Sequence, residues 1–131
     1  MKKLLLLLAF APLFFSCSKG SGGADTSGKD SRYKIQLAFT ANDPETKYDV
    51  TIYEYNDKNE KMGQNLMTGS KKDASASFKA NPLSVKLKIY VKYYSPTSTY
   101  YYAWVQQVFY LNLGKETSIT ITSSMLGKNE P

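Results

Sequence analysis

The 131-residue chain contains no histidine and a single cysteine, Cys17. Without histidine it cannot build a Ser-His-Asp or Cys-His nucleophile system or an imidazole metal site. A single cysteine also excludes an intramolecular disulfide. Arg32 is the only arginine, so the sequence lacks the arginine cluster that is common in nucleic-acid-binding proteins. We therefore expect no cofactor, no metal and no nucleic-acid partner, and we expect the protein not to be an enzyme.

The sequence also lacks an apolar run long enough to cross a bilayer, which takes ~20 residues. Its longest run, residues 4–15, follows Lys2 and Lys3 and suits the apolar region of a signal peptide. Ordinary signal peptidase needs small residues at the cut, and the candidate Ala9-Phe10-Ala11 is followed by Pro12, which disfavours cleavage. The pattern predicts a signal peptide over residues 1–16 that is cut by another enzyme.

The alternative cut lies before Cys17, with the small residue Ser16 beside the bond and Leu13, Phe14 and Phe15 ahead of it. This segment resembles the lipobox of bacterial lipoproteins, and its looser form is similar to that of Bacteroidota lipoproteins. The resemblance implies diacylglycerol on the Cys17 sulfur, cleavage, and acylation of the new amino group. Two or three acyl chains anchor a protein stably, whereas one chain binds only marginally. We therefore expect Cys17 to attach the protein to the outer membrane.

Residues 17–31 continue from this cysteine as a glycine- and serine-rich segment with almost no apolar side chain. Such a composition cannot bury enough surface to fold and predicts a flexible tether, whose mean reach is roughly 20 Å. Surface-exported lipoproteins of Bacteroidota are similar to one another in carrying acidic residues after the cysteine, and residues 18–21 (SKGS) lack them. Attachment facing the periplasm is therefore favoured over the cell surface.

Residues 32–126 carry the period-two alternation of half-buried strands, and residues 127–131 follow as a tail. Strands are predicted at 33–39, 48–55, around 66–67, and at 74–80, 84–94, 99–113 and 118–122. Because one open sheet would leave an apolar face in water, the predicted fold is an all-β, antiparallel two-layer β-sandwich of six to seven strands. The last third of the chain is similar to the closing strands of immunoglobulin-like or transthyretin-like sandwiches in such lipoproteins.

Aromatic side chains concentrate in the predicted hairpin of residues 84–113, interleaved with lysines. Tyrosine and tryptophan offer large, rigid contact area with a polar tip, which suits them to bind sugars, peptides or proteins. The same residues are also good strand formers that fill cores. The candidate binding surface consists of Lys88, Tyr90, Lys92, Tyr94, Tyr100, Tyr102 and Trp104.

The register of this hairpin decides between the two interpretations. A four-residue loop would pair Tyr94 with Thr99 and turn Tyr100, Tyr102 and Trp104 into the core. A five-residue loop would expose them beside the lysines. The first register would bury Gln106 and the second Gln107, so a bulge that switches faces is a further alternative.

Three functions follow from these features. The first is a non-catalytic binding or adaptor lipoprotein that holds a glycan, a peptide or an envelope protein. The second is a structural component of an envelope assembly, joined through exposed sheet edges. The third and weaker is a small hydrolase that uses carboxylate pairs. Those pairs, Asp43 with Glu45 and Asp57 with Glu60, lie in turn-like segments, and Asp57, Asn59 and Glu60 could alternatively bind calcium.

Overall fold

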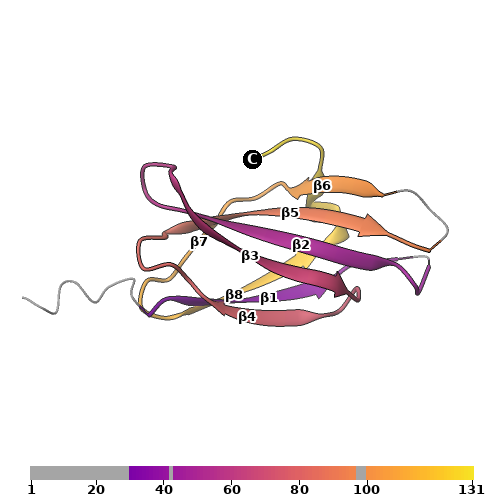
Figure 1. The fold of residues 1–131 in the computed structure, drawn as a ribbon, viewed down its shortest axis with the longest axis horizontal. Helices are drawn as coiled ribbons and strands as arrows, with labels where there is room; N and C mark the ends of the chain where they lie inside the picture. Colours follow the sequence, from indigo (N-terminus) through magenta and orange to yellow (C-terminus); the bar gives the residue numbers. More distant parts are fainter. Residues whose placement is uncertain (1–29, 42, 97–99) are drawn as a thin grey trace, which may run out of the picture.

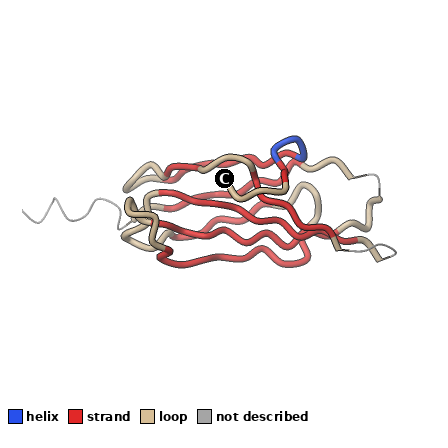
Figure 2. The backbone as a smooth tube through the Cα atoms, turned by 90° about the horizontal axis from the view of Figure 1, so that it is seen from above, coloured by secondary structure: helices blue, strands red, loops and turns tan. Residues whose placement is uncertain are grey.

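The computed structural model describes residues 30–41, 43–96 and 100–131. The predicted signal peptide, Cys17 and the tether as far as residue 29 lie outside these residues. Within them the chain is almost entirely β, and the helical structure is the short 3-10 turn Ser123–Met125, blue in Figure 2. This part of the chain has no helix of the length and apolarity that a membrane span requires.

The described residues form nine strands in two stacked sheets (Figure 1). The smaller sheet has the order β4-β1-β8, and the larger has the order β3-β2-β5-β6-β9, with β7 also beside β5. The prediction of an all-β, two-layer sandwich is therefore confirmed. The strands are β1 (Arg32–Ala38), β2 (Lys47–Tyr55), β3 (Lys61–Ser70), β4 (Ser75–Lys79), β5 (Lys86–Tyr94), β6 (Tyr101–Val105), β7 (Phe109–Tyr110), β8 (Glu116–Thr122) and β9 (Leu126–Gly127).

One strand pair departs from the predicted antiparallel arrangement. β1 and β8 run in parallel, from Arg32 opposite Glu116 to Ala38 opposite Thr122. This register sets Ile35 against Ile119 and Leu37 against Ile121, so the apolar positions of both strands enter the core together. In an immunoglobulin constant domain the first strand lies beside the second. Here β1 instead lies between β4 and β8.

The predicted long return strand, residues 99–113, is interrupted. β6 ends at Val105 and β7 begins at Phe109, with Gln106 and Gln107 exposed in a bend between them. Continuing the strand in one register would place one of these glutamines in the core, where its amide would lose hydrogen bonds to water. Instead, the Gln106 backbone N–H donates to the Met125 carbonyl at 2.7 Å.

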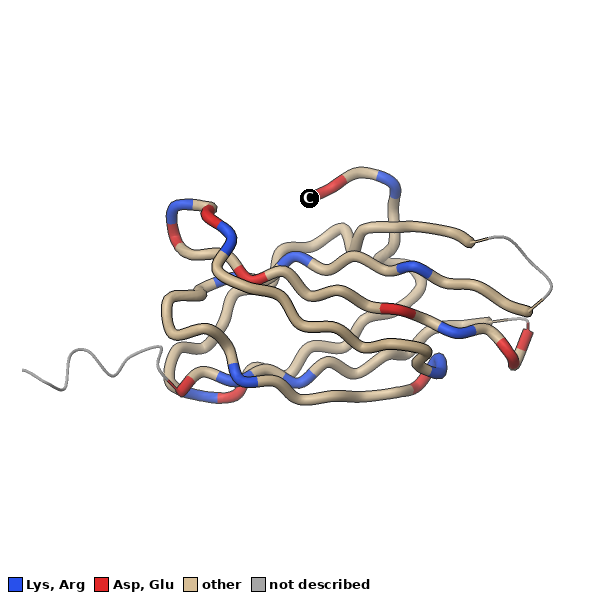
Figure 3. The backbone as a smooth tube through the Cα atoms, viewed as in Figure 1, with Lys and Arg blue, Asp and Glu red and all other residues tan. Residues whose placement is uncertain are grey.

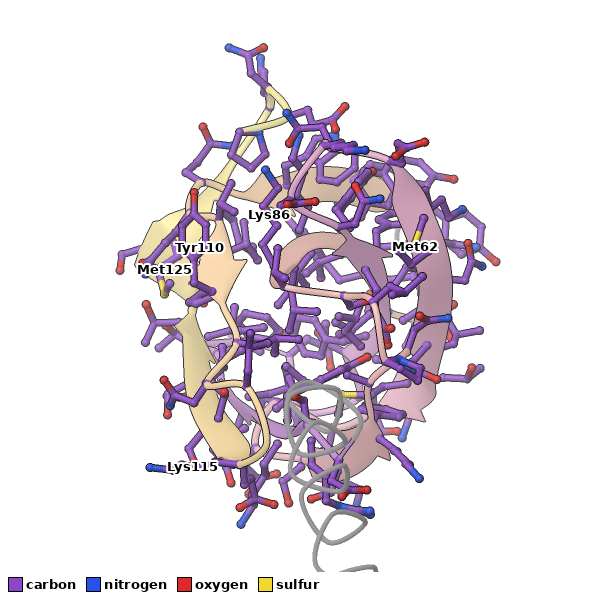
Figure 4. All side chains as sticks on the ribbon, turned by 90° about the vertical axis from the view of Figure 1, so that its left-hand side faces the viewer. Met62, Lys86, Tyr110, Lys115 and Met125 are labelled. Atoms are coloured by element: carbon purple, nitrogen blue, oxygen red, sulfur yellow. The ribbon has the colours of Figure 1, made fainter. Side chains whose placement is uncertain are left out.

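The core lies between the sheets and is built from alternate residues of each long strand. In β2, Val50 and Ile52 are fully buried, while Asp49 and Thr51 face outward, as the alternation predicted. Figure 4 looks along the strands from the end where β1 begins and shows side chains between the two layers of ribbon. The largest fully buried side chains are Tyr33, Ile35, Leu37, Ile52, Leu87, Ile89 and Ile121.

Both ends of the domain extend slightly beyond the predicted boundaries. Ser31, placed in the tether by its composition, is fully buried, and its Oγ accepts a 2.8 Å hydrogen bond from the Gly114 N–H. Gly114 has φ +77°, a conformation that side-chain-bearing residues rarely adopt. At the other end, Gly127 of the predicted tail is part of β9, which pairs with β6. The folded unit therefore includes both Ser31 and Gly127.

Candidate functional site

The outer face of the larger sheet carries most of the aromatic residues that do not enter the core. β2, β5 and β6 each place alternate side chains on this face, and neighbouring strands are in register, with Tyr90 opposite Trp104 and Lys92 opposite Tyr102. We call this surface the aromatic–lysine face. It consists of Tyr53, Tyr55, Lys61, Lys88, Tyr90, Lys92, Tyr94, Tyr100, Tyr102 and Trp104.

The hairpin register is the one expected from a five-residue loop. Because Lys92 pairs with Tyr102, the side chains of Tyr102 and Trp104 point to the same side as the lysines of β5 rather than into the core. Tyr100 and Tyr102 are each more than half exposed, at 54% and 56%. The structure thus brings all seven residues of the predicted surface onto one face.

The rings of this face contact one another across the strands. The centroid of Trp104 lies 4.9 Å from that of Tyr90 and 5.8 Å from that of Tyr53, so the indole bridges from β6 to β2. Tyr90 and Tyr102 are stacked at 6.1 Å. Ring pairs of this kind hold each other in place. The result is a row of aromatic planes that is already ordered at the surface.

Lysine ammonium groups lie over several of these rings. The Nζ of Lys92 is 4.2 Å from the ring centroid of Tyr100, and that of Lys61 is 4.8 Å from the centroid of Tyr53. Each such contact is attractive by about 0.5–1 kcal/mol at exposed sites. Burial among the rings raises the pKa of Tyr90 above its ordinary 10.0, and the nearby Tyr102 acts in the same direction, so this phenol stays neutral and can donate a hydrogen bond.

Sequence reasoning missed part of this face. Asp49 and Thr51 were predicted to face outward from their strand. Tyr53 and Tyr55 continue the same series of every second residue, so the alternation could have predicted that they face outward too. Lys61, the first residue of the weakly alternating strand β3, gave no comparable signal. Lys86 and Tyr110, opposite each other in the β5–β7 register, extend the face toward the end where β1 begins (Figure 4).

No protein-family model matches the chain, and no curated protein sequence matches it.

Two of the carboxylates considered for hydrolysis or calcium binding, Asp43 and Glu60, take part in local turns. Oδ1 of Asp43 accepts a hydrogen bond from the Glu45 N–H at 2.9 Å. In the next turn, Asn56 Nδ2 donates to Oε1 of Glu60 at 3.0 Å, which fixes that side chain beside its own loop. Within residues 30–41, 43–96 and 100–131, no three potential metal ligands of the histidine, cysteine or carboxylate type gather in one place.

Glu54 is the carboxylate that the structure buries, at 2% exposure. Its Oε1 accepts hydrogen bonds from the Tyr33 hydroxyl at 3.0 Å and from Asn65 Nδ2 at 3.1 Å. Its Oε2 accepts from the Asn81 N–H at 2.8 Å and from the Ser84 hydroxyl at 3.0 Å. All four donors belong to the domain itself, so this carboxylate stabilises the fold by satisfying buried hydrogen-bond donors.

A cleft of about 280 Å³ opens at the opposite end of the sandwich from the start of β1. Its aromatic wall includes Tyr48, Tyr93 and Tyr101, and Asp43 lies at its rim, with no lysine among its described lining residues. Tyr93 stacks on Tyr101 at 5.3 Å. The cleft therefore differs in charge from the aromatic–lysine face, although the same β5–β6 hairpin borders both.

Proposed function

We propose that this protein is a lipid-anchored, non-catalytic binding module of the bacterial cell envelope that uses its aromatic–lysine face to hold a glycan, a peptide or a partner protein. The observation that carries this proposal is the ordered row of rings outside the core. Core packing does not require these residues, because Val50, Ile89 and Val91 already fill the opposite side of the same strands.

An ordered aromatic surface has an energetic advantage in binding. Side chains that are free in solution lose rotamer entropy when a ligand fixes them, at about 0.5–1.5 kcal/mol each. Contacts such as Trp104 with Tyr90 and Tyr53 restrict the rings before any ligand arrives. Tyrosine and tryptophan are also the residues that most often dominate binding energy at interfaces. The face is therefore suited to binding and needs little reorganisation.

The proposed location follows from the amino-terminal sequence. A lipobox-like segment ending at Cys17 supports anchoring in the outer membrane, and the residues after Cys17 favour the periplasmic side over the cell surface. The tether would join the folded domain at Ser31, the end from which β1 starts. The aromatic–lysine face runs along the strands from that end, so a bound chain could lie beside the domain.

The test is an array of glycans and peptides probed with the full-length, lipidated protein in detergent. Trp104→Ala and Tyr102→Ala are expected to weaken retention of the bound ligands about ten-fold or more while the domain stays folded. Leu83→Ala is the control, since Leu83 is 67% exposed but lies in the β4–β5 connection, off the face. Ligand retention that is unchanged in both face variants would refute the proposal.

A structural role in an envelope assembly is the second candidate. The larger sheet ends at β3, whose outer backbone edge is not paired within the described residues, and Leu66 of that strand is 54% exposed. A partner could extend the sheet by adding a strand there. Co-purification of an envelope protein after mild detergent extraction, abolished by Leu66→Pro but not by Trp104→Ala, would favour this role over ligand binding.

A further inference from the structure

Aromatic planes and positive charges alternate along the aromatic–lysine face. Besides the contacts of Lys61 and Lys92, the Nζ of Lys88 lies 5.4 Å from the ring centroid of Tyr55. Each of these ammonium groups thus lies over a ring of the face rather than in a separate patch. A ligand on this face would meet an apolar plane and a cation at neighbouring positions, repeated along the strands.

The charge of this side of the sheet is predominantly positive. In Figure 3, lysines follow β5 along its length. The acidic groups at the outward positions of β2 and near the chain end are Asp49, whose Oδ1 accepts a hydrogen bond from the Gly69 N–H at 2.7 Å, and Glu130. Asp57 and Glu60 lie in the exposed turn between β2 and β3. The lysines on this side, from the outward positions of β2 and β5 and from the start of β3, are Lys47, Lys61, Lys86, Lys88 and Lys92.

A carboxylate of the chain itself already occupies part of the face. Oε1 of Glu130 lies 3.1 Å from Nζ of Lys88, and the segment that carries it is held by a 2.6 Å hydrogen bond from Gln106 Nε2 to the Asn129 carbonyl. Glu130 is about half exposed, so its carboxylate can leave without opening the core. The pair shows the geometry in which this face accepts a carboxylate.

We infer that the face binds an acidic polysaccharide, whose sugar rings stack on the tyrosine and tryptophan planes and whose carboxylates pair with the lysines. This inference rests on the proposed function and names its ligand class. β5 alone is roughly 30 Å long at about 3.3 Å per residue, which fits a polymer rather than a single sugar. On binding, a ligand carboxylate replaces Glu130 at Lys88.

Single-stranded nucleic acid also combines ring faces with negative charge and binds to surfaces of aromatic and basic residues. Two features favour the polysaccharide. The basic residues of the face are all lysines, and the one arginine, Arg32, belongs to the smaller sheet. The lipobox-like segment further indicates export, which removes the protein from the cytosol.

The experiment measures binding of the full-length protein in detergent to polygalacturonate and to the same polymer after chemical reduction of its carboxylates. Both polymers present the same sugar rings, so the comparison isolates the charge. Poly-glutamate supplies carboxylates without sugar rings, and oligo-dT supplies a nucleic acid. We expect binding to polygalacturonate, a loss of about ten-fold or more on reduction of the carboxylates, and weaker binding to poly-glutamate and oligo-dT.

Matched variants assign the binding to this face. Lys92→Gln is expected to weaken binding about three-fold and to lower its salt dependence, whereas Lys34→Gln, on the outer face of the smaller sheet, changes neither. Glu130→Gln removes the internal competitor and is expected to strengthen binding to polygalacturonate about two- to five-fold. This gain would not arise if Glu130 only stabilised the fold.

The outcomes separate this inference from the proposed function. Equal affinity for the reduced polymer, or tighter binding to oligo-dT, overturns the acidic polysaccharide and leaves a binding face of another specificity. The same conclusion follows if array ligands depend on Trp104 but polygalacturonate is not bound. If neither the polymers nor any array ligand is sensitive to Trp104→Ala, both the inference and the proposed function fail.

Discussion

The hydroxyl of Tyr33 donates a 3.0 Å hydrogen bond to Oε1 of Glu54 between the two sheets of the sandwich. Tyr33 belongs to β1 in the smaller sheet and Glu54 to β2 in the larger one. Both side chains are buried, so the bond forms where little water can compete. Through its other acceptor positions Glu54 also fixes Asn65 and the turn before β5. This carboxylate therefore joins β1, β3 and the segment before β5, which lie far apart in the sequence.

Glu54→Gln is expected to lower the free energy of unfolding by about 2–4 kcal/mol. The amide would place an NH₂ group where one carboxylate oxygen now accepts two hydrogen bonds. The two donors to that oxygen would then be buried without an acceptor. Urea denaturation followed by circular dichroism measures the change. Glu60→Gln, in an exposed turn, is the matched control and should change stability by less than about 0.5 kcal/mol. Equal effects of the two substitutions would contradict the structural role of Glu54.

Alkaline pH is expected to destabilise the domain through Tyr33. Burial raises the pKa of this phenol above its ordinary 10.0; a hydrogen bond from Asn65 opposes the shift, and the Glu54 carboxylate reinforces it. As pH rises through 10, the unfolded chain loses this proton while the folded chain keeps it, so the folded state binds more protons and stability falls with pH. The contribution is fully present below about pH 10.

Tyr33→Phe isolates this contribution. The variant lacks a hydrogen bond and should be less stable than the wild type at about pH 8, but its stability should fall less steeply toward about pH 11. Chemical denaturation at a series of pH values measures both slopes. Identical slopes would show that Tyr33 does not govern the alkaline loss.

The exposed tyrosines of the aromatic–lysine face should contribute little to folding. Tyr102→Ala is expected to cost about 1 kcal/mol or less, because the side chain keeps most of its contact with water in the folded state. Ile89→Ala, at the centre of the opposite side of the same sheet, should cost about 3–4 kcal/mol through loss of buried surface and the cavity left behind. Thermal unfolding of the two variants compares them directly. A large loss at Tyr102 would place that ring in the core.

Gly127→Ala is expected to destabilise the domain by about 1–2 kcal/mol. A Cβ atom at this position would lie 2.6 Å from Cδ of Gln106, and that side chain cannot move freely because its Nε2 donates to the carbonyls of Trp104 and Asn129. Gln106→Ala removes the obstacle, so the two substitutions should be non-additive in a double-mutant cycle. Additive effects would show that the strain lies elsewhere.

Alternation of apolar and polar residues was enough to predict the β-sandwich. It located the buried sides of β2 and β5, because each has an unbroken series such as Val50 and Ile52 or Ile89 and Val91. It could not identify strand neighbours: the parallel partnership of β1 with β8 depends on contacts between segments some 80 residues apart. β9 was missed because two residues are too short to show a period.

The candidate face was predictable in composition but not in orientation. Three successive tyrosines, residues 100–102, are compatible with either side of a strand, and only the pairing of Lys92 with Tyr102 decides which rings face out. For Glu54 the orientation was predictable, but the burial of a charged residue was not. Its position continues the inward series of Tyr48, Val50 and Ile52, but a carboxylate enters a core only where donors from distant segments converge on it.

The parallel pairing of β1 with β8 determines how the two strands would respond to a pulling force. The chain enters β1 at one end of the sandwich, and β8 leaves at the other, with continuous pairing from Arg32 and Glu116 to Ala38 and Thr122. Tension between an anchor before β1 and a load beyond β8 would shear the whole set of interstrand hydrogen bonds at once instead of peeling them apart in turn. Resistance to such a pull would therefore depend on the β1–β8 pair as a whole.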